Sequence, residues 1–293
     1  MPAPRFKYLK PEDIRKLAAY EFAPRNVVEG YLAGRHRSFQ RGPSSEFRDY
    51  RQYVAGDDPA SLDWKVFART DRYFVRTFDQ ETDTACYIFL DSSSSMGFGT
   101  ETTKLEYASC FTAALSYLVT KSGNQVALGI FDNGIRSFLP LGGTGTHLRN
   151  IMATLEDNHP ENETSVAEAM RNALPMTRRK GSIVVISDFF DDPGEIFAAL
   201  SRFLHRGFKV YLFHILAPEE TLLAPNTLRR FVDMETGAKL IVHPDTIRKQ
   251  YNNAINAHIA RIRAAAVRRG VEYSMSRTDS HYFTLFDKLV KAK

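Results

Sequence analysis

The stretch CYIFLDSSSSMG, residues 86–97, joins an apolar run to an acid and four consecutive serines. The run predicts a buried strand that ends on Asp91. Because Asp91, Ser93 and Ser95 are spaced by two residues, an extended backbone turns their side-chain oxygens toward the same side. Such a set offers hard oxygen ligands for a cation. Taken alone, the stretch also suits a helix N-cap or a turn, because Ser and Asp favour both.

From residue 84 onward, short β-rich runs alternate with longer helical patterns. This alternation predicts an α/β domain in which helices cover both faces of a doubly wound, mostly parallel sheet. The turn sequence Asp132-Asn133-Gly134 makes the strand after it an antiparallel edge strand. The expected strands are 85–91, 126–131, 135–141, 181–192, 208–216 and 271–277, the expected helices are 103–121, 146–156, 165–174, 194–205 and 244–269, and a hairpin is expected at 228–242.

The 293 residues are expected to form an N-terminal region, 1–83, packed on a domain formed by 84–293. Cys86 and Cys110 both lie in apolar stretches, which indicates buried thiols in a reducing compartment. The N-terminus lacks the apolar segment of a secretory signal. The longest apolar runs are far shorter than the roughly 20 residues that span a bilayer. We therefore expect a soluble, cytoplasmic protein.

A second acid, Asp188, follows the β-branched run 183–187. Parallel strands present their carboxyl ends at one edge of the sheet, and ligands bind there where the strand order reverses. If the two strands are neighbours, Asp91 and Asp188 can share an ion. The pattern resembles the von Willebrand factor A fold, whose metal-ion-dependent adhesion site has the signature Asp-x-Ser-x-Ser, a distant Thr and a distant Asp.

This resemblance implies a metal site formed by Asp91, Ser93, Ser95, Thr164 and Asp188. Thr164 is chosen because it precedes the helix 165–174, which is the place that family uses. Thr144 and Thr146, which follow a pair of glycines, are the competing candidates. Carboxylates and hydroxyls suit Mg²⁺, with Mn²⁺ as the alternative, whereas Zn²⁺ prefers nitrogen or sulfur.

Residues 34–81 resemble the lead-in segment of a bacterial family, domain of unknown function number 58, which places this segment directly before a von Willebrand A-like domain. The matching residues are Gly34, Ser38, Gly42, Glu46-Phe47, Arg51-Gln52-Tyr53, Gly56-Asp57-Asp58, Asp63-Trp64, Ala68-Arg69 and Glu81. Residues 59–62 depart from the family pattern, in which an arginine and an isoleucine are common.

The lead-in residues have two interpretations. One is a docking surface for a partner, formed by Arg51, Asp57, Asp58, Trp64 and Arg69. The other is that the charged side chains pair with one another locally and that the tryptophan is a packing anchor.

The family resemblance implies a non-catalytic adaptor that works with a MoxR-type AAA+ ATPase in the assembly or maturation of other proteins. On this hypothesis the metal ion binds an acidic residue of the ATPase or of its client protein, and the chain is not an enzyme.

Two other function classes stay open. Two acids around magnesium can support phosphate hydrolysis, although the chain has no Walker A loop, GxSxG elbow or Asp-x-Asp pair. The acid-free helix 246–271 is a candidate nucleic-acid contact, and a solvated basic helix face is the alternative.

Overall fold

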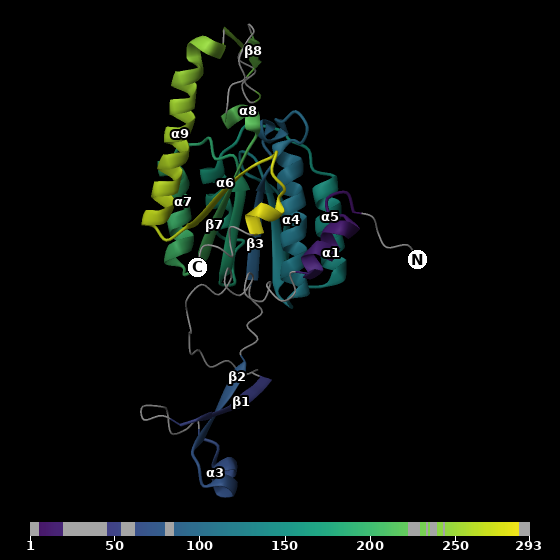
Figure 1. The fold of residues 1–293 in the computed structure, drawn as a ribbon, viewed down its shortest axis with the longest axis vertical. Helices are drawn as coiled ribbons and strands as arrows, with labels where there is room; N and C mark the ends of the chain where they lie inside the picture. The colour runs from purple at the N-terminus through teal and green to yellow at the C-terminus, as the bar shows by residue number, and fades with distance from the viewer. Residues whose placement is uncertain are drawn as a thin grey trace. The chain divides into compact units, whose positions relative to one another are not determined.

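The computed structural model describes residues 6–19, 46–53, 62–79, 85–221, 229–232, 234, 239–242 and 244–286. The chain divides into two compact units (Figure 1). The larger unit comprises Met1–Arg35 and Thr84–Lys293, and the smaller unit is His36–Asp83. The expected division into 1–83 and 84–293 stays a prediction. The packing of the N-terminal region 1–83 on the domain 84–293 stays a prediction as well.

The larger unit is built on a six-stranded sheet with the order β10-β7-β6-β3-β4-β5. All neighbouring strands in it pair in parallel except β5, which pairs antiparallel with β4. The strands are β3 (Ala85–Asp91), β4 (Gln125–Phe131), β5 (Ile135–Gly142), β6 (Gly181–Ser187), β7 (Lys209–Leu216) and β10 (Glu272–Arg277). The strand order reverses between β3 and β6. This arrangement confirms the predicted α/β fold, a doubly wound, mostly parallel sheet with one antiparallel edge strand.

Helices cover both faces of this sheet (Figure 1). Helices α1 (Pro11–Ala19), α4 (Lys104–Lys121) and α5 (Gly145–Glu156) pack on one face, and α6 (Val166–Ala173), α7 (Pro193–His205) and α9 (Pro244–Arg268) pack on the other. Helix α4 begins with a capping box, in which Thr103 accepts the Glu106 N–H and the Glu106 side chain accepts the Thr103 N–H. This box fixes the start of α4 beside the end of β3.

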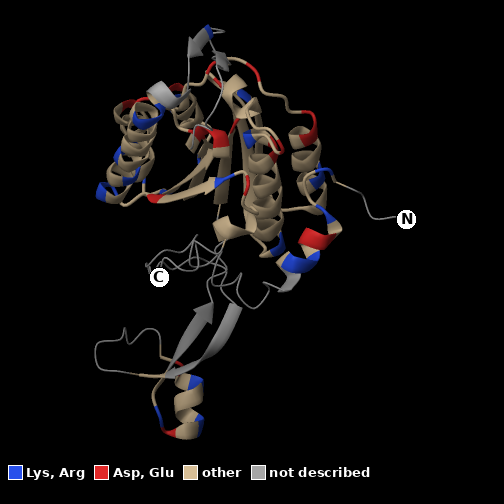
Figure 2. Cartoon of the chain, turned by 45° about the horizontal axis from the view of Figure 1, so that its top comes forward, with Lys and Arg blue, Asp and Glu red and all other residues tan. Residues whose placement is uncertain are grey.

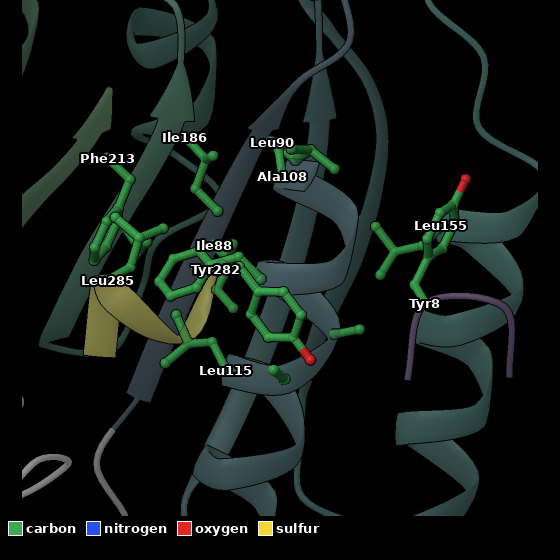
Figure 3. Packing of buried hydrophobic residues seen from close by; sticks show 14 of the residues in the cluster. Tyr8, Ile88, Leu90, Ala108, Leu115, Leu155, Ile186, Phe213, Tyr282 and Leu285 are labelled. Carbon is green, nitrogen blue, oxygen red and sulfur yellow. The ribbon is translucent and has the colours of Figure 1, made fainter. Parts of the chain in front are cut away.

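The core consists of two apolar clusters, one on each side of the sheet. Along β3, Ile88 and Leu90 belong to the cluster under α4, and Tyr87 and Phe89 belong to the opposite cluster. Strand geometry requires this alternation. Figure 3 shows the first cluster, where buried side chains from several elements meet: Ile88, Leu90, Ala108, Leu115, Ile186, Phe213, Tyr282 and Leu285. Because β3 is buried on both faces, its sequence is a continuous apolar run up to Asp91.

Short elements complete the larger unit at the carboxyl edge of the sheet. The 3-10 helix η3 (Ser94–Gly97) follows β3, and α8 (Pro218–Thr221) follows β7. Strands β8 (Arg229–Val232) and β9 (Lys239–Val242) pair antiparallel, as the predicted hairpin requires. Within the described residues, no helix has both the length and the apolar character needed to cross a membrane.

The smaller unit contains an antiparallel pair and one helix. Strand β1 (Glu46–Gln52) pairs with β2 (Phe74–Asp79), and helix α3 (Trp64–Thr70) lies between them in the chain. Asp63 caps α3 by accepting the N–H groups of Lys65 and Val66. Ring stacking of Phe67 on Tyr73, with centroids 4.6 Å apart, packs the helix on the segment that leads into β2.

Gly181 permits the close approach of β6 to β3. A Cβ atom at this position would lie 1.9 Å from the carbonyl oxygen of Ala85. We expect Gly181→Ala to force the strands apart and to lower the free energy of unfolding by about 2 kcal/mol, measured by urea denaturation with circular dichroism. In the control Gly145→Ala, a new Cβ at the first residue of α5 meets nothing within 4 Å. Equal stability of the two variants would contradict the strand contact.

Candidate metal centre

Two carboxyl groups leave the sheet from neighbouring strands. Strands β3 and β6 pair in parallel with Leu90 opposite Ile186, so Asp91 ends β3 level with Ser187 and Asp188 follows one residue later at the same carboxyl edge. Both side chains are buried, with exposures of 0% for Asp91 and 1% for Asp188. The strand order reverses between these strands, and α/β sheets bind ligands at such a point. The adjacency on which the metal-site interpretation depends is therefore present.

Serine hydroxyls connect the two carboxyl groups. The Ser187 hydroxyl donates to Asp91 Oδ2 at 2.5 Å, and the Ser93 N–H donates to Asp91 Oδ1 at 2.9 Å. The Ser93 and Ser95 hydroxyls lie 3.1 Å apart, and the Ser95 hydroxyl donates to Asp188 Oδ2 at 2.9 Å. Four of the five predicted ligands, Asp91, Ser93, Ser95 and Asp188, therefore form one continuous chain of polar contacts.

Thr164 lies in the loop between α5 and α6, and this loop is tied to the serine loop. The Ser94 N–H donates to the Asn162 carbonyl at 2.8 Å, and the Glu161 N–H donates to the Ser92 carbonyl at 2.9 Å. The hydroxyl of Thr164 is buried and has no hydrogen-bond partner. Because an unpartnered buried hydroxyl is costly, a ligand on this oxygen would account for it.

The competing threonines are engaged elsewhere. Thr144 is the N-cap of α5 and accepts the His147 N–H at 3.1 Å. The Thr146 hydroxyl accepts from the Arg149 guanidinium at 2.9 Å. Of the three, only Thr164 has a hydroxyl that is buried without a partner. These contacts favour Thr164.

The two aspartates repel each other. Burial and the nearby charge of Asp188 raise the pKa of Asp91 to about 7, against the opposing effect of hydrogen bonds from Ser187 and Ser93. A cation between the carboxylates would relieve this repulsion. Within the described residues, no group of three or more His, Cys, Asp or Glu side chains could hold a metal ion. An ion here would therefore depend on hydroxyl oxygens, and this donor set suits Mg²⁺ or Mn²⁺.

Lys104 and Glu220 also belong to this centre, although the sequence interpretation missed both. The Lys104 ammonium lies 2.6 Å from Asp188 Oδ2 and 2.5 Å from Glu220 Oε1, and the lysine side chain is fully buried. Burial acts to lower the pKa of Lys104, but the charges of Asp188 and Glu220 outweigh it and raise the pKa, so the group stays an ammonium. The one feature of the sequence that could have pointed to Lys104 is its position in the first turn of α4, where the helix dipole disfavours a positive charge.

Two partly exposed phenylalanines border the buried charges. Phe98 is 37% exposed, and its carbonyl accepts the Lys104 N–H at 3.0 Å. Phe190 is 45% exposed, and its ring centroid lies 5.2 Å from the Lys104 ammonium. The ring of Phe190 also stacks on His258 of α9. Exposed aromatic side chains beside a polar centre are typical of surfaces that contact another macromolecule.

The acids that follow Asp188 have local structural tasks. Asp191 accepts the Val166 N–H at 2.7 Å and so supports the start of α6. Asp192 is the N-cap of α7 and accepts the Glu195 N–H at 3.1 Å. These contacts agree with their interpretation as turn and cap residues.

The five residues of the predicted docking surface all lie in the smaller unit. Trp64 is the first residue of α3 and is 60% exposed, and Arg69 is exposed in the same helix. Arg51 lies in β1, but its side chain is outside the described part of the chain, as are Asp57 and Asp58. The docking surface therefore stays a prediction.

Helix α9 carries the basic segment, and Lys and Arg recur along it (Figure 2). Two bases of this segment, Arg263 in α9 and Arg269 directly after it, lie against aromatic rings of the protein itself. The Arg263 guanidinium lies 5.7 Å from the ring centroid of Tyr273, and that of Arg269 lies 5.1 Å from the ring centroid of Phe197. Such contacts give part of the basic segment a structural explanation. Nucleic-acid binding stays a prediction.

The curated relatives that this chain resembles are described as uncharacterised proteins. Proteins of Mycobacterium tuberculosis and Mycobacterium bovis are 30% identical to it over 186 residues, which cover 60% of this chain and 58% of each relative. The match thus spans less than two thirds of their length. A protein of Bacillus subtilis is 24% identical over 151 residues, which cover 51% of this chain and 36% of that protein.

Two solved structures from Bacteroides show a weaker likeness. One is described as conserved hypothetical protein BatB from Bacteroides thetaiotaomicron, and the other as an aerotolerance-related membrane protein from Bacteroides fragilis. Each is 18% identical with a TM-score of 0.48, and the match covers 71% of this chain. It covers 98% of the first structure and 97% of the second.

One family model matches residues 49–261, from β1 into α9. Its description is that of the family which the lead-in residues 34–81 resemble. Because the match extends over more than half of the sequence, the chain belongs to the family described as "Protein of unknown function DUF58".

Proposed function

We propose that this chain is a non-catalytic, metal-dependent protein-interaction module that serves as an adaptor of a MoxR-type AAA+ ATPase. In this proposal Mg²⁺ or Mn²⁺ is held by the metal centre, Asp91, Ser93, Ser95, Thr164 and Asp188. The observation that carries the proposal is the chain of contacts from Asp91 to Asp188, which runs through the Ser93 N–H and the hydroxyls of Ser93 and Ser95. The unpartnered hydroxyl of Thr164 adds support.

The donor set favours recruitment of an outside ligand. Asp91 and Asp188 supply two negative charges, and the hydroxyls supply neutral oxygens. Magnesium takes six oxygen ligands and usually keeps several waters. A carboxylate from another protein can replace one of those waters and complete the shell.

The partner class follows from the family resemblance, and the surface beside the centre supports a protein partner. Phe190 offers a partly exposed ring 5.2 Å from the Lys104 ammonium, and Phe98 is a partly exposed residue whose carbonyl bonds the Lys104 N–H. Aromatic anchors surrounded by polar groups carry much of the binding energy at protein interfaces. An acidic residue of the ATPase or of its client would bind the ion, and the rings would bind adjoining apolar surface.

Asp91→Asn should abolish most of the metal affinity. Loss of a group that merely orients a metal ligand costs about 10–100-fold in affinity, so loss of a ligand charge should cost at least about 100-fold. Isothermal titration calorimetry with Mn²⁺ measures this, with folding checked by circular dichroism. The control is Asp192→Ser, which removes a nearby carboxylate but keeps a side chain able to cap α7. Unchanged Mn²⁺ binding by Asp91→Asn would refute the proposed centre.

Thr164→Val should weaken Mn²⁺ binding by roughly tenfold, because it removes one oxygen ligand while it keeps the side-chain shape. Thr146→Val is the matched control, since its hydroxyl already bonds Arg149. The same titration measures both variants. A loss of affinity in the control but not in Thr164→Val would assign the ligand to the other loop.

Binding to a purified MoxR-type ATPase should require both the metal ion and the aromatic rim. We expect EDTA to abolish binding and Phe190→Ala to raise the dissociation constant about tenfold, measured by surface plasmon resonance with added Mg²⁺. Val267→Ala is the control, because Val267 is a 72% exposed apolar residue on α9. Binding that persists in EDTA and in Phe190→Ala would refute the adaptor role of this centre.

A further inference from the structure

We propose that Lys104 is an internal counter-cation that competes with the divalent ion for Asp188, and that Glu220 retains Lys104 when the ion is bound. This inference rests on the proposed metal centre and adds to it a device that sets the ion affinity. Lys104 lowers the affinity, and Glu220 raises it.

The position of Lys104 is unfavourable unless both acids accept it. Its side chain is fully buried, and a charged group removed from water needs partners close by. It is also the first residue of α4, where the helix dipole repels a cation. The ammonium meets Asp188 at 2.6 Å and Glu220 at 2.5 Å, with the ring of Phe190 beside it. These contacts hold the charge against one acid of the metal centre.

The competition arises at one oxygen atom. Asp188 Oδ2 accepts hydrogen bonds from the Ser95 hydroxyl and from the Lys104 ammonium. An ion that contacts Ser95 and Asp188 would lie next to the same carboxylate. Two cations that share one carboxylate would repel each other strongly in a protein interior. Binding of the ion therefore weakens the contact of Lys104 with Asp188.

Glu220 keeps the Lys104 ammonium paired when the ion weakens its contact with Asp188. Asp91, Asp188 and Glu220 carry three negative charges when ionised, and Lys104 carries one positive charge, which leaves two negative charges without compensation. One divalent ion neutralises the set. The lysine then stays charged, paired with Glu220, and does not have to leave the interior.

Glu220 is held from two sides. Its second carboxylate oxygen accepts the Ala217 N–H at 2.8 Å, directly after β7. Its backbone carbonyl accepts the hydroxyl of Tyr251, from α9, at 2.8 Å. A shift of the lysine toward Glu220 therefore acts on a residue that joins α8 to α9. Ion binding at the metal centre is therefore coupled, through Lys104 and Glu220, to helices α8 and α9.

Lys104→Met tests the competition, because methionine fills a similar volume without the charge. We expect Mn²⁺ to bind the variant about tenfold more tightly than the wild type, since one repelling charge is gone. Isothermal titration calorimetry measures the dissociation constant, and circular dichroism checks the fold. Lys180→Met is the control, an exposed lysine just before β6, and should leave the constant unchanged. Wild-type affinity in Lys104→Met would overturn the inference.

Glu220→Gln gives a second, opposite test that does not depend on the folding of Lys104→Met. It should weaken Mn²⁺ binding by roughly three- to tenfold, because Lys104 is left with Asp188 alone. In the double variant Lys104→Met/Glu220→Gln, the loss of Mn²⁺ affinity caused by Glu220→Gln should be smaller than in the wild-type background. An ion pair with a purely structural role would not produce this difference. Equal effects in both backgrounds would overturn the inference. Absence of Mn²⁺ binding in the wild type and in all variants would instead refute the metal centre itself.

Discussion

The parallel pairing of β3 with β6 brings two carboxyl groups, Asp91 and Asp188, into one buried place. An ion removed from water costs several kcal/mol even after relaxation of its surroundings, on the order of 5 kcal/mol. The neighbouring residues compensate for this cost. Ser187 and the Ser93 N–H bind one carboxylate, while Ser95 and Lys104 bind the other. The polar contacts at this edge of the sheet follow from the need to stabilise these two acids.

The surrounding elements hold these contacts in place through apolar packing. Met96, within η3, is fully buried and anchors the serine loop to the core. The capping box at Thr103 fixes the start of α4 and with it the backbone of Lys104. Strand ends and capped helix starts position side chains more tightly than free loops do. The centre is therefore preorganised by the same packing that stabilises the sheet.

The sequence allowed prediction of those parts that depend on local patterns. The period-2 spacing of Asp91, Ser93 and Ser95 and the apolar runs of β3 and β6 follow from strand geometry, so the sheet edge and both acids could be placed. Thr164 required the family resemblance, because nothing in the loop itself distinguishes it from Thr144.

Lys104 and Glu220 could not be found in this way. They are separated by 116 residues, and Glu220 lies in a four-residue helix that has no apolar period. A lysine at a helix start also resembles a solvent-exposed residue. Burial of a long charged side chain depends on which loops meet in three dimensions, and no spacing along the chain reports that. The pair becomes visible only when α4 and α8 are seen to converge on Asp188.

A buried ion pair between Lys104 and Asp188 could by itself be regarded as a structural replacement for a metal ion. Two features argue against that explanation. One lysine cannot neutralise three carboxyl groups, and Asp91 is left with a pKa raised to about 7 by burial and by Asp188. The hydroxyl of Thr164 also stays buried without a partner. Hydroxyls of α4, such as those of Ser109 and Thr112, share this property, but Thr164 lies in the loop that is hydrogen-bonded to the serine loop. A divalent ion accounts for both features at once, whereas the lysine accounts for neither.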